Sequence, residues 1–248
     1  MNNLLSVKNI QKKYNTIKGE IVAIEDISFD VEKGNFISIV GSSGCGKSTL
    51  LNIISGLDKQ TYGEILFLNN LKVGYMLQED ALLPWLTVLQ NATLGLKLTK
   101  SDTKENIEYV KNLLITYGLE KFINKYPSEL SGGMKQRVAL IRTLATKPDL
   151  LLLDEPFSAL DYQSRLSVSD DVYSIIKKEK KTVIMITHDI AEAISLSDKV
   201  IVLSQRPAVI KKVYSIHLSN KSSPINNRQC KEFPYYYEKI WRDLDVSI

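Results

Sequence analysis

Residues 35–51 read Asn35-Phe-Ile-Ser-Ile-Val-Gly41-Ser-Ser-Gly-Cys-Gly46-Lys47-Ser48-Thr-Leu-Leu, and this segment is the strongest indication of the fold. Its first part, residues 35–41, is a short β-branched run that breaks at a glycine, which predicts a strand. A helical pattern begins at Lys47. Between the two, Gly41 to Ser48 fits G-x-x-x-x-G-K-[ST], the pattern of a phosphate-binding loop (P-loop), and strand, loop and helix come in the order that this motif requires.

This loop offers the groups that a nucleotide phosphate needs. Glycines let the backbone curl so that its N–H groups point at phosphate oxygens, and the helix N-terminus adds a favourable dipole. We expect Lys47 to bridge the β and γ phosphates and the Ser48 hydroxyl to ligate Mg²⁺. The alternative for the segment by itself is a plain glycine turn. The predicted nucleotide contacts are Gly41, Ser42, Ser43, Gly44, Cys45, Gly46, Lys47, Ser48 and Thr49.

Two neighbouring acids follow a second apolar run, Leu150-Leu-Leu-Leu-Asp154-Glu155. Open α/β sheets bind ligands beyond the carboxyl ends of their strands, so both side chains are expected beside the phosphates. Asp154 is expected to hold Mg²⁺ through water, and Glu155 to polarise the attacking water as general base. Adjacent acids after a strand are common, so this interpretation depends on the P-loop that precedes them.

The remaining pattern is that of an α/β sheet with a helical insertion. Nearly continuous apolar runs predict strands buried on both faces of a parallel sheet, at 150–154, 182–187 and 199–204. Helical patterns lie between them, at 161–180 and 189–196. A further helix is expected between an Asp102–Glu105 capping pair and Gly118. We therefore place a helical insertion at 86–146 inside an α/β core.

Composition excludes several classes of protein. The 248 residues include 44% apolar and 24% charged side chains, as in an ordinary globular protein. The net charge is +4 with no dense basic block, so neither nucleic acid nor lipid headgroups are expected as partners. The sequence has no run of about 18 apolar residues, the length needed to span a bilayer, and its start does not resemble a signal peptide. Cys45 and Cys230 lack zinc spacing, which favours a reducing, cytoplasmic compartment.

A third segment points to a family. Leu130-Ser131-Gly132-Gly133-Met134-Lys135-Gln136 resembles the signature sequence, LSGGQ, of the ATP-binding cassette (ABC) family, with Met134 in place of the usual Gln. It precedes a predicted helix at 134–145, so it forms a second helix N-terminus with free backbone amides for an anion. Taken by itself, the segment could equally be a serine cap of an ordinary helix.

The resemblance extends along the chain to positions that would be weak signals singly, since a lone aromatic, Gln or His is more often structural. It implies that Tyr14 stacks on adenine, Gln78 senses the γ-phosphate and Mg²⁺, and His188 is the switch histidine. Ser158-Ala-Leu-Asp161 resembles the D-loop, with Asp161 near the nucleotide. The implied fold is that of a P-loop NTPase, α/β, with a RecA-like core, an inserted helical subdomain and a small antiparallel β arm.

The resemblance implies one ABC ATPase domain over residues 1–248. Its parts would be the α/β core with its arm, the helical signature subdomain, and a C-terminal tail helix, at 1–85 with 147–215, at 86–146, and at 216–248. Between Gly63 and Gln78 the chain is shorter than in typical members, which suggests a trimmed strand or hairpin in the arm. Stretches such as Leu82–Asn91 and Tyr235–Leu244 resemble the importers of nitrate, sulfonates and taurine.

Family mechanism implies a homodimer arranged head to tail. The P-loop of one copy and Ser131–Gly133 of the other would enclose each ATP with Mg²⁺, and Glu155, His188, Lys47 and Gln78 would carry catalysis. Further implied partners are two transmembrane permease subunits, whose coupling helix meets a groove at Pro84–Trp85, and an extracytoplasmic binding protein. The chain would then sit at the cytoplasmic face of the membrane, attached through the permease. The alternative is an ABC ATPase of DNA repair or translation, but the coiled-coil arms, zinc modules or tandem cassettes of those chains are not seen.

Overall fold

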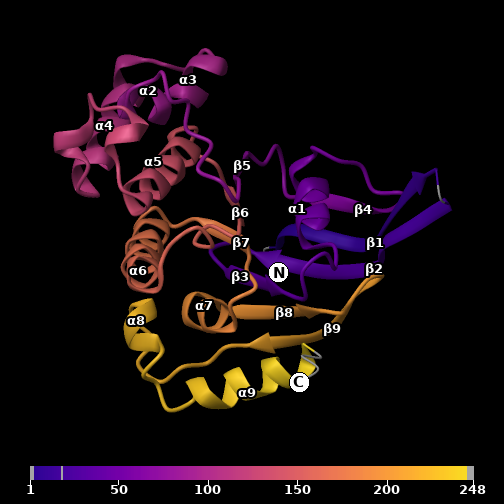
Figure 1. Ribbon diagram of the computed structural model, residues 1–248. Helices are drawn as coiled ribbons and strands as arrows, with labels where there is room; N and C mark the ends of the chain where they lie inside the picture. Colours follow the sequence, from indigo (N-terminus) through magenta and orange to yellow (C-terminus); the bar gives the residue numbers. More distant parts are fainter. Residues whose placement is uncertain (1–2, 18, 245–248) are drawn as a thin grey trace.

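The computed structural model describes residues 3–17 and 19–244, and Figure 1 shows how the elements are arranged. The strands are β1 (Asn3–Thr16), β2 (Gly19–Glu32), β3 (Phe36–Val40), β4 (Tyr62–Phe67), β5 (Val73–Met76), β6 (Leu150–Asp154), β7 (Thr182–Ile186), β8 (Lys199–Leu203) and β9 (Ala208–Ser215). The helices are α1 (Lys47–Ser55), α2 (Val88–Ala92), α3 (Leu94–Leu98), α4 (Lys104–Thr116), α5 (Gly132–Ala145), α6 (Tyr162–Lys178), α7 (Ile190–Leu196), α8 (Pro224–Asn227) and α9 (Phe233–Asp243).

Over the described ranges the strands form one nine-stranded sheet in the order β4-β1-β2-β9-β8-β3-β7-β6-β5. Five adjacent strands, from β8 to β5, run parallel. Their side chains alternate between two buried clusters: Leu151 and Leu153 of β6 face one, and Leu150 and Leu152 face the other. Both faces of the parallel core are therefore covered, as the continuous apolar runs predicted.

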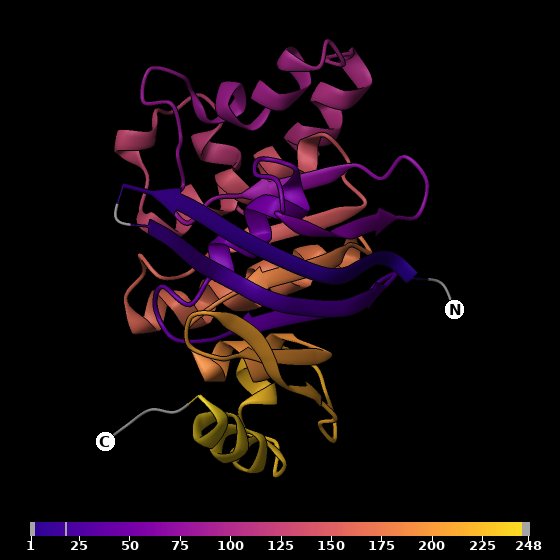
Figure 2. The ribbon, with the colours of Figure 1, turned by 90° about the vertical axis from the view of Figure 1, so that its right-hand side faces the viewer.

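The rest of the sheet is a long curled arm. β1 and β2 pair antiparallel over most of their length, and β4 pairs antiparallel with the other edge of β1. Figure 2 shows these two long strands crossing the front of the molecule. The segment from Gly63 to Gln78 contributes most of β4 to this arm and β5 to the parallel core.

Helices cover the sheet on both sides. α1 packs with the arm strands against one face, whereas α5 and α6 pack against the other. α7 and α9 form a third cluster with β8. The stretch between β5 and β6 supplies α2 to α5, and Figure 1 shows α2, α3 and α4 gathered beyond the sheet at the upper left. Where the domain parts begin and end stays a prediction.

Two expected helix starts are wrong by one or two residues. Thr103, not Asp102, caps α4, because the Thr103 hydroxyl accepts a hydrogen bond from the N–H of Asn106. Threonine is also a favoured cap residue, and Thr103 stands one residue nearer to the apolar face. α5 begins at Gly132 rather than Met134. Among residues 3–17 and 19–244, no helix is long and apolar enough to cross a membrane.

Candidate active site

The loop between β3 and α1 holds its lysine inside. Lys47 is 6% exposed, and its Nζ donates hydrogen bonds to the backbone oxygens of Gly41 and Ser42, each at 2.9 Å. Gly46 has φ +122°, and a Cβ there would lie 3.1 Å from the backbone oxygen of Ala23. This position therefore requires glycine. Glycine and the buried lysine together thus account for the curled backbone of this loop.

Asp154 ends β6 with its carboxylate among hydroxyl groups. The Ser48 hydroxyl donates to one carboxylate oxygen at 3.3 Å, and the Tyr75 hydroxyl lies 3.2 Å from the other oxygen and 3.0 Å from Asn52 Oδ1. Burial raises the pKa of Asp154, because it disfavours the charged form more than these hydroxyls favour it. A small divalent cation with oxygen ligands fits this donor set, since it would compensate the buried charge.

Glu155 has an unusual backbone that aims its side chain. Its φ is +44°, rare for a residue other than glycine, and its N–H donates to the backbone oxygen of Ile186 at 2.9 Å. The Glu155 carboxylate lies 3.3 Å from Gln78 Nε2 and 3.0 Å from His188 Nδ1. Three residues expected from separate segments therefore meet at one carboxylate, and such strained backbone is often found at functional sites.

These groups share one cleft of about 460 Å³. Its lining comprises Ser43, Gly44, Gly46, Lys47, Ser48, Thr49, Gln78, Glu155, His188 and Arg206. Arg206 is a site residue that was not predicted from the sequence. Its guanidinium donates to the backbone oxygen of Gly44 at 2.7 Å from the turn between β8 and β9. No motif spacing signals this contact, because the strand order of the sheet creates it.

The signature segment lies in a second cavity, of about 500 Å³. Its lining comprises Ser131, Gly132, Gly133, Met134, Arg137, Ala159, Leu160, Asp161, Ser164, Ser167 and Val168. The Ser131 hydroxyl caps α5 by accepting a hydrogen bond from the N–H of Met134. The Met134 amide is therefore already paired, whereas free amides were expected at this helix N-terminus. A Cβ at Gly133 would lie 2.8 Å from Val168 Cγ2. Close packing of α5 on α6 is therefore a second physical reason for glycine here.

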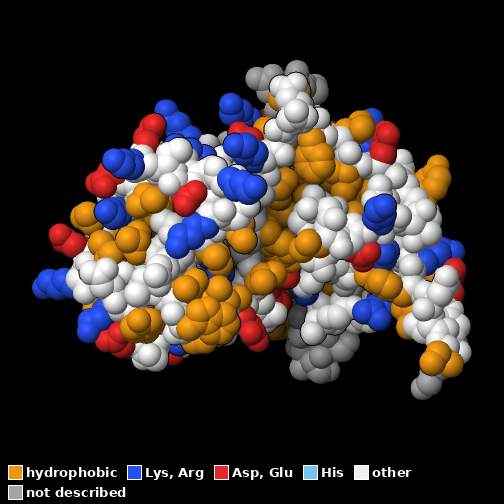
Figure 3. Space-filling view, turned by 90° about the horizontal axis from the view of Figure 1, so that it is seen from above, with side chains coloured by type: hydrophobic (Ala, Val, Ile, Leu, Met, Phe, Trp, Pro, Cys, Tyr) orange, Lys and Arg blue, Asp and Glu red, His pale blue; other side chains and the backbone are white. Residues whose placement is uncertain are grey.

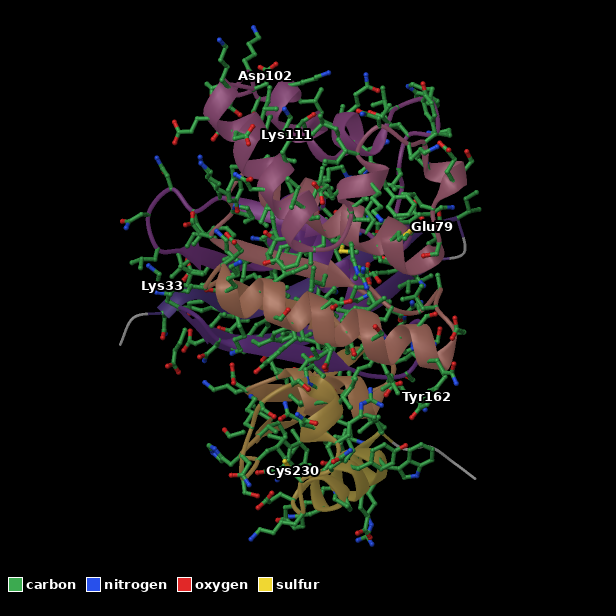
Figure 4. All side chains as sticks on the ribbon, turned by 90° about the vertical axis from the view of Figure 1, so that its left-hand side faces the viewer. Lys33, Glu79, Asp102, Lys111, Tyr162 and Cys230 are labelled. Atoms are coloured by element: carbon green, nitrogen blue, oxygen red, sulfur yellow. The ribbon has the colours of Figure 1, made fainter. Side chains whose placement is uncertain are left out.

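The two cavities are separate, and residues that neighbour them lie at one edge of the molecule. Among the described residues the two cavities share no lining residue. Glu79, next to Gln78 of the first cavity, and Tyr162, next to Asp161 of the second, lie at the same edge in Figure 4. A second molecule placed against this edge can reach groups from both cavities.

Tyr14 is held apart from the cleft lining. Its side chain is 38% exposed, and its hydroxyl donates to Asp58 Oδ2 at 2.9 Å. The Lys12 ammonium lies 4.7 Å from the centre of the Tyr14 ring and also bonds Asp58 at 2.6 Å. The tyrosine is thus fixed by two partners, and stacking on adenine stays a prediction.

Residues 24–158 match the family model described as ABC transporter. The chain belongs to the ABC transporter family. It is 44% identical to the uncharacterized ABC transporter ATP-binding protein YtlC of Bacillus subtilis, over 97% of this chain and 95% of that protein. It is 37% identical to the aliphatic sulfonates import ATP-binding protein SsuB of Bacillus cereus, over 98% and 96% of the two chains.

Two further similarities bear on activity. The nitrate import ATP-binding protein NrtD of Synechocystis sp. is 39% identical over 95% of this ABC chain and 93% of its own. The dimeric post-hydrolysis state of the ATP-binding cassette MJ0796, bound to ADP and Pi, is similar with a TM-score of 0.73 and 32% identity, over 86% of this chain and 99% of that one. The predicted ABC family, α/β P-loop fold and ATPase activity are confirmed, and the non-transport alternative finds no support.

Proposed function

We propose that this chain is the ATP-hydrolysing subunit of an ABC import system and works as one half of a homodimer that encloses ATP at its interface. The main support for this proposal is that the expected site residues are divided between two cavities. The P-loop, Glu155 and His188 line one cavity, while Ser131 and Asp161 line the other. A head-to-tail pair places the second cavity of one copy over the first cavity of the other, with ATP between them.

Binding of ATP exchanges hydrogen bonds inside the P-loop. The Lys47 ammonium, which bonds the backbone oxygens of Gly41 and Ser42, turns to oxygens of the β and γ phosphates. The backbone N–H groups of the loop and the N-terminus of α1 face the same phosphates. Positioning and charge compensation of this kind lower the barrier for phosphoryl transfer, and little covalent chemistry by the protein is needed.

Glu155 aligns the attacking water. Its carboxylate is held between Gln78 and His188, so both neighbours fix its direction. On ATP binding His188 faces the γ-phosphate, and Glu155 is left to accept a proton from water. Gln78 links this carboxylate to the segment that leads into α2.

Mg²⁺ would be held by Ser48, Asp154 and Gln78. When bound, the ion neutralises charge on the β and γ phosphates. Asp154 directs its carboxylate toward the Ser48 hydroxyl, and Tyr75 holds the other carboxylate oxygen. These hydrogen bonds fix the Asp154 rotamer, so the ligand set is oriented in advance.

The contact to the permease is proposed at the loop from Leu83 to Thr87. Trp85 in this loop is 69% exposed. The buried Asn91 side chain holds the loop by bonding the N–H and backbone oxygen of Leu83 and the backbone oxygens of Leu86 and Thr87, at 2.8–3.1 Å. Figure 3 looks onto the side of the molecule that carries α2 to α4 and shows hydrophobic side chains gathered between charged ones. An apolar coupling helix of a membrane partner fits such a surface.

For the transported substrate we propose small anions of the nitrate, sulfonate and taurine type. The names of the relatives SsuB and NrtD support this class. The system then includes two permease subunits and an extracytoplasmic binding protein, with this chain at the cytoplasmic face. Growth of a deletion strain on single nitrogen or sulfur sources tests the substrate class. Normal growth on nitrate, sulfonates and taurine would contradict it.

The enzymatic proposal is tested with Glu155→Gln. The variant is expected to bind ATP, to lose nearly all turnover and to accumulate as an ATP-bound dimer in light scattering. Removal of Mg²⁺ with a chelator is expected to stop turnover by the unsubstituted chain. The exposed acid Glu238 of α9 gives the control Glu238→Gln, which should hydrolyse ATP at the unsubstituted rate. Hydrolysis at that rate by Glu155→Gln would remove the glutamate from its role.

A further inference from the structure

Arg165, in the first turn of α6, contacts Leu160 of the signature cavity and also Asp189, the residue next to His188 of the P-loop cavity. Its NH2 group donates to the backbone oxygen of Leu160, which lines the signature cavity, at 3.1 Å. Its NH1 group lies 3.5 Å from Asp189 Oδ2, and its Nε lies 3.7 Å from Glu192 Oε1. One planar guanidinium thus faces the D-loop on one side and the start of α7 on the other.

The carboxylates that Arg165 faces hold the segment of the switch histidine. Glu192 is 3% exposed and accepts a hydrogen bond from the Thr187 hydroxyl at 2.7 Å. The N–H of Asp189 donates to the same Thr187 hydroxyl at 3.0 Å, and Asp189 caps α7 by accepting from the N–H of Glu192. His188 therefore stands between two residues that are anchored in this cluster, while its own ring contacts Glu155 in the P-loop cleft.

We propose that Arg165 is a positioning residue that couples the D-loop (residues 158–161) to His188, so that closure at the signature cavity aligns the catalytic pair in the P-loop cavity of the same chain. This inference rests on the proposed function, because it needs a partner that closes on the signature cavity. In this arrangement each chain passes the state of one ATP site of the dimer to the other.

The contacts of Arg165 are loose, as expected of a link that tightens on closure. Its Nε is buried without a hydrogen-bond partner, and the two carboxylates stand at the outer limit of contact. A shift of α6 toward α7 by a few tenths of an ångström brings Nε into hydrogen-bond distance of Glu192. The donors of arginine form a rigid fork that can serve the D-loop oxygen and both carboxylates at once, whereas lysine has a single ammonium.

The test compares Arg165→Lys, which keeps the charge, and Arg165→Met, which keeps only the length, with the unsubstituted chain. ATP affinity is measured in the presence of a chelator, and kcat and the Hill coefficient for ATP are measured with Mg²⁺. We expect unchanged ATP affinity, a kcat lower by about 10- to 100-fold, and a Hill coefficient that falls from near 2 toward 1. Glu192→Gln, which keeps the shape, is expected to show the same fall of the Hill coefficient.

The control is Arg242→Met, which removes an exposed arginine of α9 that is paired with Glu238. This variant should change neither kcat nor the Hill coefficient. If Arg165 only stabilises the packing of α6 on α7, Tm falls while kcat and the Hill coefficient of the folded protein stay normal, and the inference is overturned. If Arg165→Met does not fold, Arg165→Lys and Glu192→Gln decide by the same criterion. Failure of the unsubstituted chain to hydrolyse ATP cooperatively would instead overturn the proposed dimer.

Discussion

Glu155 and Glu192 lie on either side of the switch segment and show how position decides the role of an acid. The carboxylate of Glu155 reaches the P-loop cleft, where it contacts His188 and Gln78. That of Glu192 is buried, and burial together with the charge of Asp189 raises its pKa to about 7. The nearby charges of Arg165 and Arg228 and the Thr187 hydroxyl offset only part of this cost. Glu155 is therefore available to a water molecule, whereas Glu192 belongs to the interior.

The raised pKa of Glu192 predicts how stability changes with pH. The folded chain binds a proton at this carboxyl more tightly than the unfolded chain, whose pKa is near 4.5. Protonated Glu192 therefore adds about 3 kcal/mol to the free energy of unfolding. This contribution is fully present below about pH 4.5 and is lost as pH rises through about 7. Urea unfolding of the nucleotide-free chain should show this loss, and in Glu192→Gln this component of the pH dependence should be absent.

Glu238→Gln is the matched control, because Glu238 is an exposed acid on α9. Its unfolding free energy should follow that of the unsubstituted chain at each pH. An identical pH dependence for Glu192→Gln and the unsubstituted chain would show that folding does not raise the pKa of Glu192.

Residues within a continuous motif could be predicted, and residues that arrive through the fold could not. Lys47 belongs to the P-loop motif, and the spacing of that motif already specifies its neighbours Gly41 and Ser42. Tyr75 reaches Asp154 because β5 pairs with β6, and Arg206 reaches the P-loop because β8 lies beside β3. Such contacts depend on strand order, which no local pattern contains.

At the scale of elements, the loop between β5 and α2 is organised from both of its ends. Arg142 of α5 donates to the backbone oxygens of Asp80 and Ala81, each at 2.7 Å. Asn91 of α2 holds the following turn through its amide. The loop that begins at Gln78 and presents Trp85 therefore moves with α2 and α5. The apolar pattern predicted the helices of this region, but the side chains that hold its loop were not predicted, because single polar residues carry no period.

Replacing Asn91 by alanine should separate stability from chemistry. The change removes the amide from four hydrogen bonds and leaves buried backbone groups of the loop without partners, so the free energy of unfolding should fall by about 2–3 kcal/mol. ATP hydrolysis by the isolated chain should change little, whereas association with the permease should weaken because Trp85 loses its fixed position. Urea unfolding, ATPase assays and co-purification with the permease measure the three effects.

The neighbouring exposed residue Gln90 caps the same helix and provides the comparison Gln90→Ala. That variant loses the exposed hydrogen bond from the N–H of Thr87 to the Gln90 side chain, so its free energy of unfolding should fall much less than that of Asn91→Ala. Equal stability of Asn91→Ala and Gln90→Ala would argue against the role of Asn91 in holding the loop.

At the scale of the whole molecule, the separation of the P-loop and signature cavities within one chain makes each copy incomplete. Glu79 and Tyr162, which neighbour residues of the two cavities, lie at one edge (Figure 4), and each ATP in the proposed pair draws on both copies. The family resemblance implied this division. Its physical reason is visible only in the fold, because α5 and α6 carry the signature cavity on the far side of β6 from α1.

This incompleteness predicts complementation between two inactive variants. Lys47→Ala should lose ATP binding, because the loop loses its cation, and Ser131→Arg should bind ATP yet fail to form the ATP-bound dimer, because a large side chain enters the signature cavity. In a mixed pair, the intact P-loop of the Ser131→Arg chain faces the intact signature of the Lys47→Ala chain. The introduced arginine then faces a P-loop that holds no nucleotide.

Mixing the two inactive chains at equal concentration should therefore restore turnover, to at most about a quarter of the unsubstituted rate, since half of random pairs are mixed and each has one intact site. A double variant that carries both changes on one chain, mixed with either single variant, is the control and should stay inactive, because none of its pairs has an intact site. Activity that never exceeds that of the separate variants would mean that the two cavities do not meet around one ATP.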